Sequence, residues 1–347
     1  MNLQAVLILG QDALTNGSIY VLLAIATVLV FATTRILFMP QGEFVVFGGL
    51  TLASLQSGVM PGTVWLLLLL ACIATVTETI RQISTGGARN LPRALAVKVL
   101  PAFAIAYAAH ICVPLHLGLG WQVLLTMLIV TPMGSLLYEV AFRPLADSST
   151  LVLLIAAVAV HFILVGAALL FFGPEGFRTP AFSQAQWMLG GVSVSGQSLW
   201  TYAICLLLTG SLAWFFGRTM YGKALRAVAF NRHGAHLVGI DPCLVGSISM
   251  AMAAAIGALS GILIGSLTTL FFDSGFLIGL KGFVGAIFGG LASYPVAAAG
   301  SVLVGVMESY SSYWWSDYKD VIVFALIIPV LLWRSLSSIH LEDEELL

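Results

Sequence analysis

Residues 150–172 read TLVLLIAAVAVHFILVGAALLFF, a run without a single Asp, Glu, Lys or Arg. A helix needs about 20 consecutive apolar residues to cross the hydrocarbon core of a bilayer. Lysine and arginine are also absent from the longer intervals 36–80, 99–142, 179–217 and 233–280, and several of these can hold two crossings. The sequence therefore predicts an all-α polytopic membrane protein, with residues 1–347 forming a single transmembrane domain.

The composition supports this class of protein. Hydrophobic residues make up 60% of the chain and charged residues only 8%, against about 25% charged residues in soluble domains. The apolar runs are continuous and do not alternate, which excludes a transmembrane β-barrel. The apolar composition makes membrane lipid an expected partner, and the net charge of −1 argues against nucleic acid.

Splitting the apolar runs at Gly, Pro and charged residues gives about eleven candidate segments, some of them short. We therefore expect about 8–11 transmembrane helices, including short or broken ones. The segments centre on residues 13–33, 43–58, 63–80, 99–115, 121–139, 150–172, 198–216, 245–267, 280–292, 295–309 and 320–334.

The basic residues predict the orientation of these segments. With the N-terminus outside, only Arg178, Lys281 and Lys319 of the 14 Lys and Arg residues lie on the outer side. Cytoplasmic loops are enriched in Lys and Arg. We therefore predict that the N-terminus is outside and the C-terminus inside, with residues 336–347 as an acidic cytoplasmic tail.

The inner loop 217–245 is the richest polar segment. Residues 221–238 have the pattern of one amphipathic helix, with Gly239 as its C-cap and Pro242 preventing continuation. Such a helix either lies on lipid or docks in the groove of a cytoplasmic partner. Composition alone leaves both alternatives open.

The chain contains no motif for ATP or metal chemistry. GxxxxGK[ST], HExxH, CxxC and EF-hand patterns are all missing from the sequence. We therefore expect a protein that is not an enzyme and that binds no cofactor or metal.

Glycines recur at helical spacing in two segments. Gly257, Gly261 and Gly265 form a tandem GxxxG pattern, and Gly285 and Gly289 form a second one. In membranes such faces allow two helix backbones to approach closely. These five glycines are predicted to serve helix packing.

Four motifs occur in order along the chain. They are Arg35-Ile36 with Gly42-Glu43-Phe44, the inner-loop segment 222–240, LKGFVGAIFGGLASYP at 280–295, and Tyr318-Lys319-Asp320-Val321. Together they resemble motifs of the permease subunits of ABC importers for branched-chain amino acids. The resemblance spans about residues 12–60 and 140–332.

This resemblance implies a type II-like importer permease in the bacterial inner (plasma) membrane. The implied partners are a second related permease subunit, two cytoplasmic ATP-binding subunits that carry ATP and Mg²⁺, and an extracytoplasmic solute-binding protein. The resemblance also implies two sets of site residues. The loop that couples to the ATPase comprises Gly222, Arg226, Ala235, Leu237, Gly239 and Asp241, with Ala235 facing the partner. The translocation pathway comprises Gln41, Gly42, Glu43, Lys281 and Phe283.

The sequence departs from the family pattern in two places. Phe38, Pro40 and Gln41 replace the family's Asn, Ala and His, which leaves the identity of the solute open. Residues 63–120 have the pattern of an insertion of about two extra helices relative to the family.

Glu43 is expected in the first turn of a helix. Its carboxylate there either interacts with the positive end of the helix dipole or contacts the solute.

Two alternative functions remain at this point. One is a secondary carrier or channel for a small polar solute such as urea or an amide, with carboxylates as an ion relay. The other is an ABC permease for aromatic carboxylates.

The tetrapeptide FGGL occurs twice, at residues 47–50 and 288–291. The topology above gives these two segments opposite directions across the membrane. We therefore hypothesise an inverted-topology repeat, a common feature of transporters.

Overall fold

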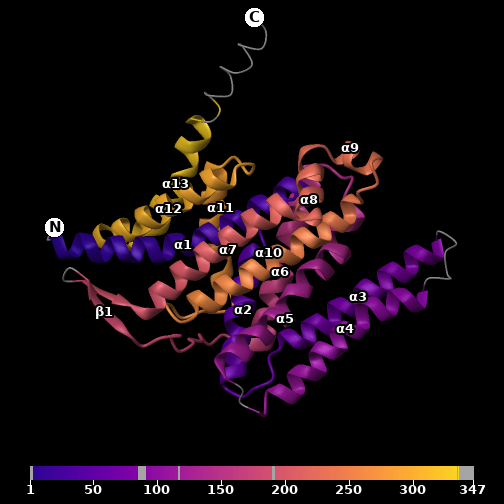
Figure 1. Ribbon diagram of the computed structural model, residues 1–347, viewed down its shortest axis with the longest axis horizontal. Coiled ribbons are helices and arrows are strands. Elements are labelled where there is room, and N and C mark those ends of the chain that lie inside the picture. The colour runs from indigo at the N-terminus through magenta and orange to yellow at the C-terminus, as the bar shows by residue number, and fades with distance from the viewer. Residues whose placement is uncertain (1–2, 85–90, 116–117, 190–191, 334, 336–347) are drawn as a thin grey trace, which may run out of the picture.

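The computed structural model describes residues 3–84, 91–115, 118–189, 192–333 and 335, and they are almost entirely helical (Figure 1). The predicted tail 336–347 lies outside the described residues. The long helices are α1 Leu3–Thr34, α2 Gln41–Gln56, α3 Thr63–Ser84, α4 Leu91–Cys112, α5 Leu119–Leu137, α6 Thr150–Phe172, α7 Gly196–Arg218, α10 Pro242–Ile264, α11 Ser274–Phe288 and α12 Tyr294–Trp314. The shorter elements are the π-helix η2 Tyr138–Phe142, the 3-10 helices η3 Arg143–Leu145 and η4 Ser316–Tyr318, the helices α8 Met220–Phe230, α9 Arg232–Leu237 and α13 Lys319–Ala325, and the hairpin strands β1 Gln186–Leu189 and β2 Val192–Ser195.

Six of the described helices are long and apolar enough to cross a membrane. They are α1, α3, α5, α6, α7 and α10, while α2 and α11 are shorter. The prediction of a polytopic all-α protein with short or broken helices is confirmed. The predicted segment 280–292 is displaced, because α11 begins at Ser274 and carries Lys281 in its interior.

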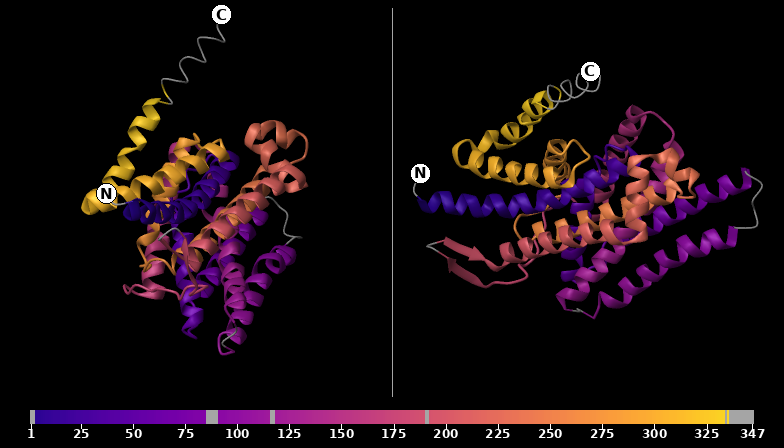
Figure 2. Two further views of the ribbon diagram at one scale, coloured as in Figure 1. Left: turned by 60° about the vertical axis from the view of Figure 1, so that its left-hand side comes forward. Right: turned by 45° about the horizontal axis from the view of Figure 1, so that its top comes forward.

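Segments that were predicted on opposite sides of the membrane lie at opposite ends of the molecule. In Figure 1 the N-terminal end of α1 and the β1 hairpin lie at the left, and α8, α9 and the free ends of α3 and α4 lie to the right. The first group was predicted outside and the second inside. The hairpin of α3 and α4, which falls in the predicted insertion 63–120, lies at the edge of the bundle (Figures 1 and 2). Its status as an insertion remains a prediction.

The central helices contact one another in a pattern that repeats. Helix α1 packs on α10, α11 and α12, and α10 packs on α1, α2 and α5. The contacts of α1 with α11 and α12 therefore correspond to those of α10 with α2 and α5. If α1 is matched to α10, α2 to α11 and α5 to α12, the same set of contacts results. The three pairs also run in opposite predicted directions across the membrane, as an inverted repeat requires.

Gly42 and Gly275 mark the centre of this exchange. A Cβ on Gly42 would overlap the carbonyl oxygen of Gly275, and a Cβ on Gly275 would lie 2.7 Å from the carbonyl oxygen of Gly42. Each glycine is the second residue of its helix, which sets the register of the repeat. The FGGL tetrapeptides do not share this register, so their match is not the mark of the repeat.

The predicted packing glycines lie where helices of this chain meet. Gly257 and Gly261 of α10 face Phe44 and the backbone of Val45 in α2. Gly285 of α11 lies against Ser301 of α12. Gly265, at the end of α10, and Gly289, at the end of α11, close the turns that follow those helices.

Candidate functional site

The inner loop forms two short helices rather than the predicted single helix. Asn231 has an extended backbone (φ −148°), which ends α8 and begins α9. Its Oδ1 accepts a hydrogen bond from the N–H of Gly234 at 2.9 Å. Thr219 caps α8 in the same way, accepting from the N–H of Gly222 at 3.0 Å. The prediction of a continuous helix over residues 221–238 is therefore wrong, because Asn is a strong N-cap residue and stops the first helix here.

The apolar face of this loop packs inward. Leu225, Val228 and Ala235 are buried with Val245 of α10 and Leu29 of α1. Ala235 is only 3% exposed, so a partner protein does not reach it. The expectation that Ala235 faces the partner is wrong, because α9 turns this side of the loop onto the chain's own core.

The end of α9 has the predicted geometry. Gly239 has φ +87°, in the left-handed region that favours glycine. The N–H of Gly239 donates to the carbonyl of His236 at 3.1 Å, and that of Ile240 to the carbonyl of Ala235 at 3.0 Å. This pair of bonds is a Schellman motif. Asp241 then caps α10, accepting from the N–H of Cys243 at 2.9 Å, so the angle between α9 and α10 is fixed at both sides.

Several large apolar side chains of the loop point away from the chain. Phe230 is 94% exposed and Leu237 86%. We call this the coupling surface and define it by Met220, Tyr221, Phe230, Leu237 and Val238, all of which are exposed. Arg226 is exposed next to it, at the rim of a cavity of about 430 Å³ between α1, α8 and residues 290–294. Gly222 is not part of the surface, because it packs against the backbone of Phe215 and Phe216.

Arg232 ties this loop to the turn between α5 and α6. Its Nη1 donates to the carbonyl oxygen of Ala146 at 2.9 Å. Its Nη2 lies 3.8 Å from Oδ1 of Asp147. The loop is therefore held against a second cytoplasmic segment as well as against α10.

Gln41, Gly42 and Glu43 lie inside the helix bundle. Nε2 of Gln41 donates to the carbonyl oxygen of Ala253 at 3.0 Å. Oε1 of Glu43 is 3.0 Å from Nδ1 of His161, at the middle of α6. Oε1 of Gln41 and both carboxylate oxygens of Glu43 have no hydrogen-bond partner in the described part of the chain, and Oε1 of Glu43 makes only the ion-pair contact with His161. Oε1 of Gln41 and Oε2 of Glu43 are therefore available acceptors at the point where α2 and α11 cross.

Lys281 belongs to a separate cluster. Its Nζ lies 2.5 Å from Oε1 of Glu308 and 2.9 Å from Oδ1 of Asp320. The hydroxyl of Tyr20 donates to Oε2 of Glu308 at 2.5 Å. The assignment of Lys281 to the outer surface is wrong, because two carboxylates compensate its charge within the bundle.

The predicted pathway residues thus form two interior groups instead of one site. Phe283 lines a narrow gap together with Thr27, Met39 and Phe276. The gap lies on the side of α11 that approaches α2. The group around Gln41 and Glu43 is buried among packed helices, whereas Glu308 of the Lys281 group borders a cavity and Asp320 is partly exposed. Their role in translocation remains a prediction.

A wider polar cavity of about 510 Å³ opens near the predicted outer end. It combines carboxylates, a cation, hydroxyls and amides. Its polar lining includes Gln11, Asp12, Thr15, Asn16, Ser195, Ser198, Glu308, Ser309, Ser312 and Lys319. Both charge signs that a zwitterionic solute requires are therefore present.

Sequence reasoning missed His161 as the partner of Glu43. The residue is the one ionisable side chain in residues 150–172. Ionisable residues inside membrane helices face the bundle interior and are often functional. That rule identifies His161, but only the structure shows which carboxylate it meets.

Comparison with known proteins gives a consistent result. Residues 94–331 match the family model described as the branched-chain amino acid transport system / permease component. The high-affinity branched-chain amino acid transport system permease protein LivH of Salmonella typhimurium is 32% identical over 213 residues, 59% of this chain and 69% of the relative. LivH of Escherichia coli (strain K12) is 31% identical over the same shares. The corresponding protein BraD of Pseudomonas aeruginosa is 30% identical over 60% of this chain and 70% of its own.

Proposed function

Because the chain belongs to the family of permease components of branched-chain amino acid transport systems, we propose that it works as one permease subunit of a larger ATP-driven importer. It is a multi-pass protein of the bacterial inner membrane and an ABC importer permease for branched-chain amino acids. In the proposed assembly a second permease, two ATP-binding subunits and an extracytoplasmic binding protein complete the machine. ATP and Mg²⁺ are bound by the ATPase partners, and this chain hydrolyses none.

The observation that carries this assembly is the coupling surface. Large apolar side chains stand exposed on two short capped helices at the predicted cytoplasmic end. Contiguous exposed apolar patches mark interaction sites. A helix presented at a fixed angle by a Schellman motif and two N-caps suits insertion into a groove of an ATPase subunit. The contact residues are then Phe230, Leu237 and Val238, and Ala235 and Gly239 hold them in place from behind.

The outer cavity supports an amino acid as the solute. Asp12 suits an ammonium group, and Lys319 suits a carboxylate. Apolar residues such as Leu9 and Leu267 border the same cavity. Urea has no carboxylate for Lys319, and an aromatic carboxylate has no ammonium for Asp12. The cavity therefore favours an amino acid over both alternatives.

The test is co-purification of the ATPase subunit with Leu237→Ser and Phe230→Ser variants, followed by solute-stimulated ATP hydrolysis in liposomes. We expect both variants to insert normally and to lose most of the ATPase. Met188→Ser is the matched control, because Met188 is also 86% exposed but lies in the hairpin at the other end. Normal ATPase binding and turnover with both loop variants would show that the loop is a lipid-surface helix.

A further inference from the structure

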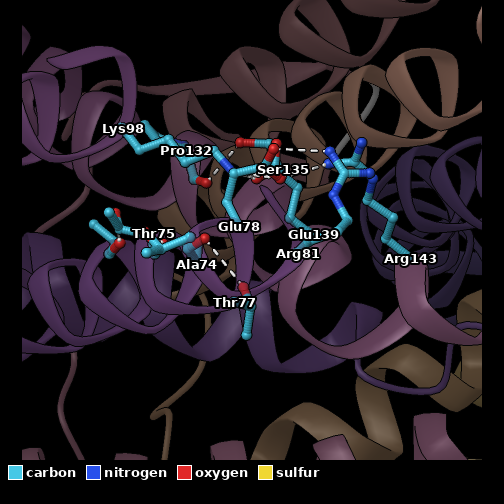
Figure 3. Close-up of polar contacts among 12 residues, drawn as sticks. Ala74, Thr75, Thr77, Glu78, Arg81, Lys98, Pro132, Ser135, Glu139 and Arg143 are labelled. Carbon is cyan, nitrogen blue, oxygen red and sulfur yellow. Dashed lines mark hydrogen bonds and ion pairs between the residues drawn. The ribbon is translucent and has the colours of Figure 1, made fainter. Parts of the chain in front are cut away.

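Five charged side chains meet at the predicted inner end of the α3–α4 hairpin. They come from four elements, with Glu78 and Arg81 on α3, Lys98 on α4, Glu139 on η2 and Arg143 on η3. We call these five residues the hairpin charge cluster. Figure 3 shows Lys98 and Arg143 on opposite sides of Glu78. None of these five residues belongs to either interior group or to the coupling surface.

The ion pairs of the cluster are shared rather than separate. Nη2 of Arg81 is 2.8 Å from Oε1 of Glu78, and Nη1 of Arg143 is 3.3 Å from Oε2 of the same carboxylate. Nζ of Lys98 lies 3.9 Å from Oε2 of Glu78 and pairs directly with Glu139. Glu139 lies in a one-turn π-helix, an element found often at functional sites.

The cluster holds three cations but only two carboxylates. The side chains of Lys98 and Glu78 are 14% and 13% exposed, whereas those of Arg143 and Arg81 are 26% and 52% exposed. The five side chains together carry a net positive charge, and the arginines present part of it to the surroundings. An anionic ligand is therefore attracted to the cluster.

The cluster also borders a cavity of about 330 Å³. Its lining places the cations next to apolar surface, including Ile80 and Pro144. Ile80 and Ile83 on α3 and Leu100 and Phe103 on α4 are exposed toward the surroundings of the hairpin. A ligand suited to this site carries an anionic phosphate beside a hydrocarbon chain.

We propose that this cavity binds the headgroup of an anionic phospholipid from the inner leaflet. Arg143 and Lys98 contact the phosphate, and the acyl chains run along the exposed apolar faces of α3 and α4. Basic pockets on the cytoplasmic side of membrane proteins bind such headgroups. A phospholipid headgroup and free phosphate present the same phosphate oxygens to these cations. The apolar surface beside the cavity favours the lipid over free phosphate.

The test measures lipid retention by the full chain in detergent, using native mass spectrometry with phosphatidylglycerol and phosphatidylcholine. We expect one retained phosphatidylglycerol per chain and little phosphatidylcholine. Arg143→Gln leaves two cations facing two carboxylates, so the cluster stays balanced and the fold intact. A cation near the membrane surface contributes about 1 kcal/mol, so retention should fall about fivefold. Arg218→Gln is the control, since Arg218 lies on the same predicted side but outside the cluster.

Three outcomes overturn the proposal. Equal retention of both lipids shows that the site does not select charge. An equal loss in the Arg218→Gln control shows a general effect of surface charge. A third arm adds inorganic phosphate alone, and thermal stabilisation by phosphate equal to that by phosphatidylglycerol vesicles identifies a free phosphate site instead of a lipid site.

Discussion

Glycine serves different ends in the crossing of α2 with α11 and in the cytoplasmic loop. At Gly42 the backbone of a second helix occupies the place where a side chain would stand. At Gly239 nothing lies within 4 Å of an added Cβ, but φ is +87°. The first glycine is required by space and the second by backbone conformation.

The difference shows how much each region tolerates. A side chain at the crossing must push apart two helices that are packed on both faces. A side chain at Gly239 meets no neighbour and destabilises the fold only through its left-handed backbone, by roughly 1–2 kcal/mol. The interior therefore responds to substitution by losing its packing, whereas the loop responds by changing an angle.

The largest effect is expected from Gly42→Leu. Overpacking usually costs about 1–3 kcal/mol, and overlap with a backbone carbonyl lies at or beyond the upper end of that range. We expect most of the protein to misfold, so that the peak of folded protein in fluorescence-detected size-exclusion chromatography becomes much smaller. Gly166→Leu is the control, because Gly166 of α6 has open space around it. Glu43→Ala adds no volume, so we expect it to reduce transport less than Gly42→Leu does. If Glu43→Ala reduced transport more, the carboxylate would have a direct role in contacting the solute.

The second effect concerns charge in the interior. Lys281→Met leaves Glu308 buried without its cation, and breaking a buried pair costs about 3–5 kcal/mol. The melting temperature in detergent should fall clearly below that of the parent protein. The double variant Lys281→Met/Glu308→Met should recover part of the loss, because it removes both buried charges. No recovery would mean that Lys281 acts chiefly through Asp320.

Gly239→Val gives a smaller, local effect. The left-handed backbone makes a β-branched residue unfavourable by about 1 kcal/mol or more. We expect normal insertion and only a slightly lower melting temperature, but clearly reduced co-purification of the ATPase subunit. Gly239→Asn should retain more binding, since Asn tolerates this conformation better. Equal behaviour of the two variants would show that the capped turn does not control the coupling surface.

Arg226→Ala should give the smallest effect. Arg226 is exposed at the rim of the loop, and such charges influence association rates more than final affinity. We expect slower ATPase association at low ionic strength and no difference at 1 M salt, where the screening length is about 3 Å. Surface plasmon resonance at two salt concentrations measures this. A difference that persists at high salt would place Arg226 inside the interface.

Sequence patterns predicted the fold well because the apolar runs are long and uninterrupted. The run 150–172 became α6 with the same bounds, and the Gly239–Pro242 pattern became the predicted cap. Local patterns could not show tertiary partners. The predicted topology placed Lys281 on the outer side, at the start of segment 280–292, yet α11 begins at Ser274 and Glu308 and Asp320 compensate the charge of Lys281 in the interior. Ala235 was assigned to the partner because the break at Asn231, which redirects the second helix, was not recognised.

Arg232 joins the inner loop to the turn that leads into α6. Its guanidinium donates to the carbonyl oxygen of Ala146 and lies 3.8 Å from Oδ1 of Asp147. Helix α6 begins at Thr150, directly after that turn, and carries His161 next to Glu43 at the start of α2. A continuous chain of contacts therefore runs from α9 to the point where α2 and α11 cross, and we expect a displacement of the loop to be felt there.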